Sequence, residues 1–255
     1  MMIEFRTSRP DLERAPSPRD AYEDIYRTEP IQQIDSFYLW ALSLANVQPG
    51  QRLLDVSCGT GRLVHLGREL RAVGVDFSAS AIYAARAQAS NGAFLVGDAE
   101  ALPFADGAFD RVINLGSLEH YDAPARAVRE MARVLAPGGL AVILVPNTFS
   151  YLHVLYVWRH GRVFDDGQPL QRYGTHVEWR ALLEANGLRV ARTVKYQRVR
   201  PRFWRDAVWY LTRPTKLLQL LLTPFLPLHA ASCFVFVCEP RSAHSGNLGP
   251  LEDTE

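Results

Sequence analysis

Residues 53–63 read Leu-Leu-Asp-Val-Ser-Cys-Gly-Thr-Gly-Arg-Leu, and this stretch decides the fold. Residues 52–56 are short and apolar, which favours a buried strand, and the small residues 57–61 then favour a loop. Residues 62–70 are typical of a helix. A strand, a small-residue loop and a helix in this order form the first unit of many α/β ligand-binding folds.

The same alternation extends in both directions along the chain. Upstream, apolar residues at helical spacing predict a helix over residues 31–45, which the turn at Pro49-Gly50 ends. Downstream we expect strands at residues 72–76, 93–96, 109–115 and 140–145, and helices at residues 78–89 and 124–135. Short apolar strands separated by helices indicate a parallel sheet covered on both faces, with ligands beyond the carboxyl ends of the strands.

After Pro146 the pattern changes to an aromatic and basic segment. A helix is then expected over residues 177–186, and strands are expected at residues 188–199 and 232–237. The sequence therefore predicts an α/β fold with a Rossmann-like, doubly wound sheet. We expect this sheet to be mostly parallel, with an antiparallel last strand and helices on both faces.

Both ends of the chain are polar. Residues 1–18 are rich in Arg, Pro, Ser and Asp, and residues 240–255 are similar, so we expect two disordered tails that cannot offset their own ordering entropy. Residues 19–239 are then predicted to form a single domain. Two insertions, at about 147–175 and 200–230, are expected to act as a lid or as part of an acceptor site.

The composition limits the class of function. The 255 residues carry a net charge of +1, which lacks the basic excess of a dedicated nucleic-acid binder. Residues 151–216 nevertheless contain 13 Lys or Arg against 5 Asp or Glu, so this segment is expected to meet something anionic. The three cysteines are too few and too unevenly spaced for a disulfide framework or a metal-binding knuckle. No apolar signal-peptide core is found near residue 1, and we expect a cytoplasmic protein.

Dinucleotide dehydrogenases also place glycines after the first strand, so they are an alternative for the loop at residues 57–61. Their Gly-x-Gly-x-x-Gly pattern, started at Gly59, requires a third glycine where this chain has Val64. The dehydrogenase fingerprint is therefore excluded.

Residues 53–63 instead resemble the first motif of class I S-adenosylmethionine-dependent methyltransferases, especially the type 11 group that includes quinone-biosynthesis enzymes. The resemblance covers about residues 20–190. Further blocks match that family in order: Val75-Asp76-Phe77-Ser78, residues 97–104, Phe109-Asp110, Leu118-Glu119-His120 and residues 133–139. Several blocks in register make the resemblance far more specific than one block alone.

The resemblance implies S-adenosylmethionine as the cofactor and assigns its contacts. Asp76 is implied to bind the ribose, because two carboxylate oxygens can accept both cis-hydroxyl protons. Asp98 and the amide of Ala99 are implied to read the adenine edge, and Asp55 to interact with the ammonium end. The remaining implied contacts are the loop residues Ser57, Cys58, Gly59 and Gly61, then Phe77, the floor residues Asn114 and Leu115, and Tyr22 and Tyr26 from the N-terminal helix.

The chain departs from the family at Ser57, where glycine is usual. If this loop requires a positive φ, serine adds strain of order 1 kcal/mol. The serine then either weakens cofactor binding or supplies a hydrogen bond through its hydroxyl, and the sequence leaves both outcomes open.

Two histidines are candidate general bases for an acceptor hydroxyl, because the pKa of histidine lies near neutral pH. His120 follows the fourth strand, where the acceptor pocket is expected, and His176 opens the late helix. A purely structural role is the alternative for each of them. No metal site is expected, because the chain lacks a His-Glu-x-x-His pattern and paired cysteines.

The acceptor is expected to be a small or lipid-linked molecule. Residues 147–173 mix aromatic and arginine side chains, and residues 200–230 are apolar with nearby arginines, which favours peripheral membrane contact or a simple cap over the pocket. Prolines at 214, 224 and 227 argue against a membrane-spanning helix there. One alternative is an RNA or protein methyltransferase, and the modest net charge disfavours an RNA acceptor. The other alternative is a non-catalytic scaffold of the same fold.

Overall fold

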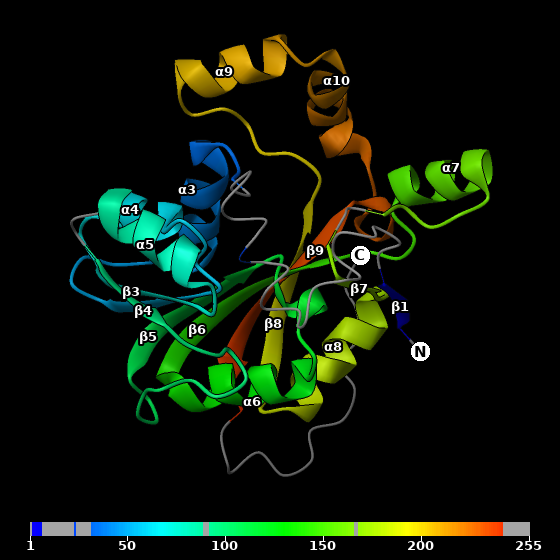
Figure 1. Ribbon diagram of the computed structural model, residues 1–255. Coiled ribbons are helices and arrows are strands. Elements are labelled where there is room, and N and C mark those ends of the chain that lie inside the picture. Colours follow the sequence, from blue (N-terminus) through cyan, green and yellow to red (C-terminus); the bar gives the residue numbers. More distant parts are fainter. Residues whose placement is uncertain (1, 7–22, 24–31, 89–91, 166–167, 242–255) are drawn as a thin grey trace.

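The computed structural model describes residues 2–6, 23, 32–88, 92–165 and 168–241. Its centre is a seven-stranded sheet in the order β4-β3-β2-β5-β6-β9-β8 (Figure 1). The strands, in that order, are Ala93–Val96, Arg71–Asp76, Arg52–Val56, Phe109–Leu115, Leu135–Pro146, Cys233–Pro240 and Leu188–Tyr196. The first five run parallel, and β9 runs antiparallel to both β6 and β8. The predicted Rossmann-like sheet with an antiparallel last strand is confirmed.

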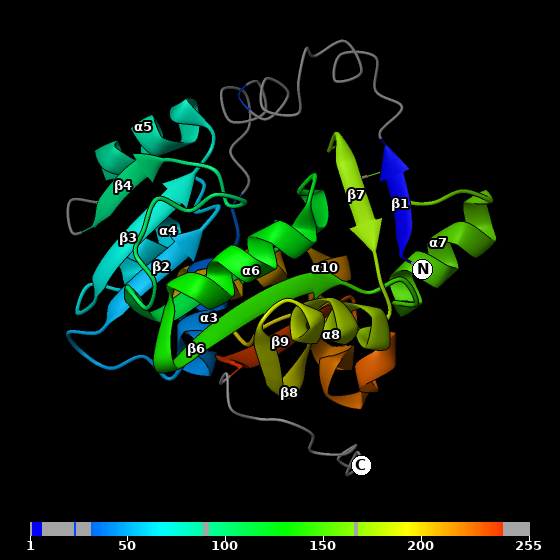
Figure 2. The same ribbon diagram turned by 90° about the horizontal axis from the view of Figure 1, so that it is seen from below.

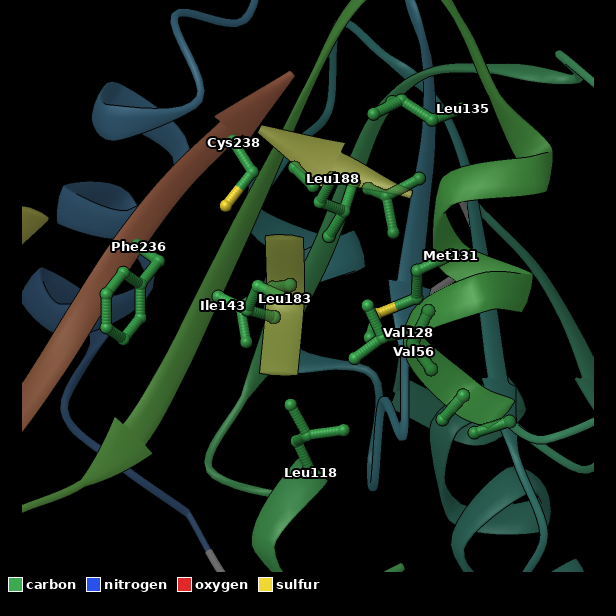
Figure 3. Close-up of a cluster of buried hydrophobic side chains, with 14 of the residues drawn as sticks. Val56, Leu118, Val128, Met131, Leu135, Ile143, Leu183, Leu188, Phe236 and Cys238 are labelled. Atoms are coloured by element: carbon green, nitrogen blue, oxygen red, sulfur yellow. The ribbon is translucent and has the colours of Figure 1, made fainter. Parts of the chain in front are cut away.

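Helices cover both faces of the sheet, because successive strand residues point to opposite sides. Leu53 packs with α3 (Asp35–Leu44), α4 (Arg62–Leu66) and α5 (Ala79–Gln88). Leu54 packs instead with α6 (Pro124–Val134) and α8 (His176–Ala185). Figure 3 shows this second core, where Val128 and Met131 of α6 lie near Val56 of β2.

The ends of several elements differ from the expected ones. The helix expected over residues 62–70 ends at Leu66, where Gly67 leaves the helical conformation. Strand β6 starts at Leu135 rather than at residue 140, because its backbone already pairs with Phe109 across a register shift. Strand β8 ends at Tyr196 instead of Val199.

A small second sheet corrects the prediction for the N-terminal tail. Strand β1 (Ile3–Arg6) pairs antiparallel with β7 (Leu170–Tyr173), so the expected disorder is wrong for these four residues (Figure 2). The pairing gives the backbone of β1 the hydrogen bonds that a tail would make with water, and Arg172 adds an ion pair with Glu4 at 3.1 Å. Residues 7–18 and 242–255 of the expected tails lie outside the described residues.

The two predicted insertions contain helices at the edge of the molecule. Residues 147–175 include α7 (Tyr151–His160) and β7, and residues 200–230 include α9 (Trp204–Leu211) and α10 (Pro214–Leu222). Helices α9 and α10 stand away from the sheet at the top of Figure 1. Among the residues that the structure describes, no helix is long and apolar enough to cross a bilayer.

Trp179 of α8 is the largest fully buried side chain among the described residues, and its indole Nε1 donates a hydrogen bond of 2.8 Å to the carbonyl oxygen of Pro146. The substitution Trp179→Ala should therefore lower the free energy of unfolding by about 3–5 kcal/mol. Chemical denaturation measures this loss. The control Trp158→Ala removes a side chain that is 84% exposed and should leave stability nearly unchanged; equal losses for both variants would contradict the packing described here.

Candidate functional site

A cavity of about 920 Å³ opens where strands β2, β3 and β5 end. The residues that directly follow these strands, Ser57, Phe77 and Gly116, all line it. The carboxyl ends of parallel strands form the usual ligand crevice of a doubly wound sheet, and this volume is typical of a small-molecule site. The fold therefore places the cavity where the sequence predicted the cofactor.

Two buried carboxylates line one wall of this cavity. Asp55 of β2 is 5% exposed and Asp76 of β3 is 2% exposed. Burial raises the pKa of Asp76 to about 6, and burial together with the nearby charge of Asp76 raises the pKa of Asp55 well above its ordinary value. Two desolvated carboxylates at one site favour a ligand that brings positive charge or hydrogen-bond donors.

Asp76 also organises the loop that follows β2. One of its oxygens accepts a hydrogen bond of 2.9 Å from the amide of Gly59, and the other accepts one of 2.9 Å from the amide of Ser78. A carboxylate oxygen can accept more than one hydrogen bond, so both oxygens keep capacity for a ligand. Asp76 thus joins two backbone segments while it lines the cavity.

Ser57 adopts the left-handed backbone conformation that favours glycine, with φ of +59°. Its hydroxyl forms a hydrogen bond of 2.7 Å with the hydroxyl of Tyr121. The side-chain Nδ2 of Asn114 donates a hydrogen bond of 2.8 Å to the hydroxyl of Tyr121 and one of 3.1 Å to the carbonyl oxygen of Val56. Ser57 therefore has the backbone strain of a positive φ that was considered from the sequence, and its hydroxyl also makes a hydrogen bond that glycine could not make.

Most residues predicted for the cofactor line the cavity. They are Asp55, Ser57, Cys58, Gly59, Asp76, Phe77, Asp98, Ala99 and Leu115. Gly61 and Asn114 do not line it. Gly61 is the N-cap of α4 with φ of +74°, and a Cβ there would lie 2.6 Å from the ring of Phe94, so its role is in packing. Tyr22 and Tyr26 lie outside the described residues.

The two candidate bases lie in different places. His120 lines the cavity, its Nδ1 lies 2.5 Å from the carbonyl oxygen of Leu170, and its Nε2 lies 3.8 Å from Oε1 of Glu119. Because a carbonyl can only accept, Nδ1 carries the proton and Nε2 is the basic nitrogen of the neutral ring. His176 does not line the cavity; it stacks on Phe236, and its Nε2 lies 2.9 Å from the hydroxyl of Thr193.

The sequence did not indicate a second group of lining residues, which we call the aromatic wall. Phe37 and Tyr38 reach the cavity from α3, and Tyr196 reaches it from the end of β8. The rings of Phe37 and Tyr196 lie 5.1 Å apart. These residues come from elements far apart in the chain, and only the helical spacing at residues 31–45 hinted that one face of α3 would be buried.

Cys58 and the acidic residues show no sign of other chemistry. Burial raises the pKa of the Cys58 thiol well above its ordinary value, so the thiolate needed of a nucleophile is disfavoured. Within the described part of the chain, no group of three or more His, Cys, Asp or Glu side chains is placed to hold a metal ion.

Comparison with known proteins places this site in a family. Residues 54–143 match the methyltransferase domain model Methyltransf_11. A probable tRNA methyltransferase 9B of Bos taurus is 32% identical over an alignment of 139 residues, and the match covers 49% of this chain and 30% of that protein. A demethylmenaquinone methyltransferase of Renibacterium salmoninarum is 40% identical over 97 residues, which are 37% of this chain and 41% of that protein. The chain thus spans less than half the length of either relative.

Solved structures share the fold at low sequence identity. A putative methyltransferase, solved in complex with the Haloferax volcanii Trm112 methyltransferase activator, has a TM-score of 0.61 at 22% identity and covers 90% of this chain and 100% of its own. A putative methyltransferase of Bacillus halodurans has a TM-score of 0.57 at 17% identity and covers 81% of this chain and 100% of its own. The matched residues 54–143 contain Asp55, Asp76 and Asp98 of the cavity wall. Over residues 54–143 the chain carries a methyltransferase domain of type 11, and the resemblance to the class I S-adenosylmethionine-dependent methyltransferases is confirmed.

Proposed function

We propose that this chain transfers a methyl group from S-adenosylmethionine to a small, apolar or lipid-linked acceptor. The observation that carries the proposal is the cavity itself, which buried carboxylates and aromatic rings line together. The carboxylates suit a cationic, hydroxyl-bearing cofactor, and the aromatic rings suit an apolar acceptor. The matches cover less than half of either curated relative, so the activities of those relatives only support the proposal.

The polar groups that line the cavity fit the cofactor part by part. Each carboxylate oxygen of Asp76 already accepts one hydrogen bond from a backbone amide, and each can accept another from a ribose hydroxyl. Asp55 offers negative charge to the methionine ammonium or to the sulfonium. Phe77 follows Asp76 and offers a ring to the adenine, whose edge Asp98 and the amide of Ala99 would read.

The chemistry needs little from the protein beyond alignment. Bound S-adenosylmethionine supplies a methyl group made electrophilic by the positive sulfur. The protein's share is to hold the acceptor in line with this methyl group and to keep water out, for which effective molarities of ~10⁵ M or more are known. Phe37, Tyr38 and Tyr196 provide the apolar walls for that purpose.

The charges around the cavity argue for an acceptor without phosphate. No Lys or Arg of the described residues lines the cavity, whereas its lining includes the acidic residues Asp55, Asp76, Asp98, Glu100, Glu119 and Asp122. This field repels phosphate and attracts cations or neutral groups. The pocket therefore favours a small aromatic or aliphatic acceptor over a nucleic acid.

A tRNA acceptor is the second candidate function. It is supported by the relative named as a probable tRNA methyltransferase 9B and by the net charge of +8 over residues 151–216. Methyl transfer from radiolabelled cofactor into a fractionated cell extract distinguishes the two acceptors. Label in the organic phase supports the apolar acceptor, and label in the RNA fraction supports the second candidate.

The pKa of Asp76 leads to a prediction on cofactor binding. The ionised carboxylate accepts ribose hydroxyls better than the protonated one, so the affinity for S-adenosylhomocysteine should fall as the pH drops through about 6. Calorimetric titration over this pH range measures the effect. Asp76→Asn should bind at least tenfold more weakly and lose this pH dependence, whereas an unchanged profile would remove Asp76 from the binding site.

Two substitutions at Ser57 separate its strain from its hydrogen bond. Ser57→Gly relieves the positive φ but removes the bond with Tyr121, and we expect a nearly unchanged free energy of unfolding. Ser57→Ala keeps the strain and removes the bond, and we expect a stability about 1 kcal/mol below that of the glycine variant. Chemical denaturation of both variants checks this order, and a more stable alanine variant would refute it.

His120 is the proposed base for an acceptor hydroxyl. His120→Ala should lower kcat by roughly 10²-fold while the affinity for S-adenosylhomocysteine stays within about twofold, because general bases contribute in this range. His176→Gln is the matched comparison and should keep kcat, since His176 does not line the cavity. If the two variants have equal turnover, His120 does not act as the base.

A further inference from the structure

Helix α9 has two unlike sides. Asp206 and Tyr210, four residues apart, are its buried residues. Its other side carries Trp204, Val208 and Leu211, and Trp204 is 75% exposed. A soluble helix that is buried on one side usually presents polar residues on the other, so this apolar side calls for a partner.

Helix α10 continues the same character. None of its residues is buried, and Leu218, Leu221 and Leu222 are exposed. Phe225, in the turn that follows, is 83% exposed and keeps the helical spacing of three and four residues. We call the following residues the α9–α10 face: Trp204, Val208, Leu211, Leu218, Leu221, Leu222 and Phe225.

Cations surround the α9–α10 face. Arg200, Arg202, Arg205 and Arg213 are exposed, and within the described residues none of them forms an ion pair. The guanidinium of Arg213 lies 4.7 Å from the ring centre of Trp209. Asp206 is the one acidic residue between residues 200 and 230, and it is buried. The exposed charge of this segment is therefore positive.

Hydrogen bonds fix this face beside the acceptor end of the cavity. The carboxylate of Asp206 accepts hydrogen bonds from both the amide and the hydroxyl of Ser36, whose neighbours Phe37 and Tyr38 line the cavity. Arg198 lies two residues after Tyr196, which lines the cavity, and it donates a hydrogen bond of 2.9 Å to the side chain of Gln219 in α10. Figure 1 shows α9 above α3, at the top of the view.

We propose that the α9–α10 face docks on the surface of an anionic lipid bilayer. Apolar side chains surrounded by arginines combine burial in the interface with attraction to anionic lipids, which is the chemistry of interfacial helices. The helices have 8 and 9 residues, too short to span the bilayer. A second copy of this chain fits less well, because a symmetric pairing would bring the same arginines together.

This inference deepens the proposed function and rests on it in one respect. If the acceptor is lipid-linked, docking through the α9–α10 face holds the cavity at the surface where that acceptor resides. The face itself is argued only from exposure, charge and helical spacing, so docking can be measured without any methyl transfer.

Flotation of the full chain with vesicles tests the docking. We expect the chain to float with vesicles of phosphatidylcholine and phosphatidylglycerol, to float far less with phosphatidylcholine alone, and to be released at high salt. The double variant Trp204→Glu and Phe225→Glu should lower the bound fraction by on the order of tenfold. Tyr83→Glu is the matched control, because Tyr83 is 81% exposed and belongs to α5, a helix that lies away from α9 and α10 (Figure 1).

Binding of S-adenosylhomocysteine, measured on the same samples, separates the two proposals. If the chain binds this ligand but does not float, docking is wrong and the proposed function stands. The same holds if the chain binds the ligand and the double variant floats as well as the unsubstituted chain. If the chain floats but does not bind the ligand, docking stands and the proposed function fails. Gel filtration gives a further outcome, since a dimer that the double variant abolishes would assign the face to a second copy and overturn the docking.

Discussion

The site depends on the cost of keeping two carboxylates, Asp55 and Asp76, out of water in one cavity wall. Burial disfavours both negative charges, and the charge of Asp76 further disfavours that of Asp55, so the pKa values of both carboxylates rise. Hydrogen bonds from the amides of Gly59 and Ser78 offset part of this cost at Asp76. A ligand with a positive charge and two adjacent hydroxyls offsets more, so the protein gains stability when that ligand binds.

The fold holds these carboxylates in place from several directions. Asp55 and Asp76 lie at the ends of adjacent parallel strands, whose alternate residues pack into helical layers on both faces. The loop between β2 and α4 is fastened at Ser57, through Tyr121 and Asn114, to the end of β5. The Ser57 hydroxyl thus adds a hydrogen bond to Tyr121 that glycine at this position could not make.

The parts of the site that are local in the chain could be predicted from the sequence. The carboxylates at strand ends and the loop at residues 57–61 could be predicted because strand, turn and helix signals are short-range. The aromatic wall could not, because Phe37 and Tyr196 meet only after α3 and β8 have packed. His176 looked equivalent to His120 in the sequence, and only the packing of α8 directs it to Phe236 instead of the cavity. The pairing of Ile3–Arg6 with β7 was missed for the same reason, since its partner lies more than 160 residues away.

The most direct test of this account is a crystal structure of the chain with S-adenosylhomocysteine. The account predicts the ribose hydroxyls on the carboxylate of Asp76, the amino end near Asp55, and the sulfur directed toward the aromatic wall formed by Phe37, Tyr38 and Tyr196. A crevice filled by the protein's own side chains, or a ligand bound elsewhere, would contradict the assignment of the cavity as the cofactor site.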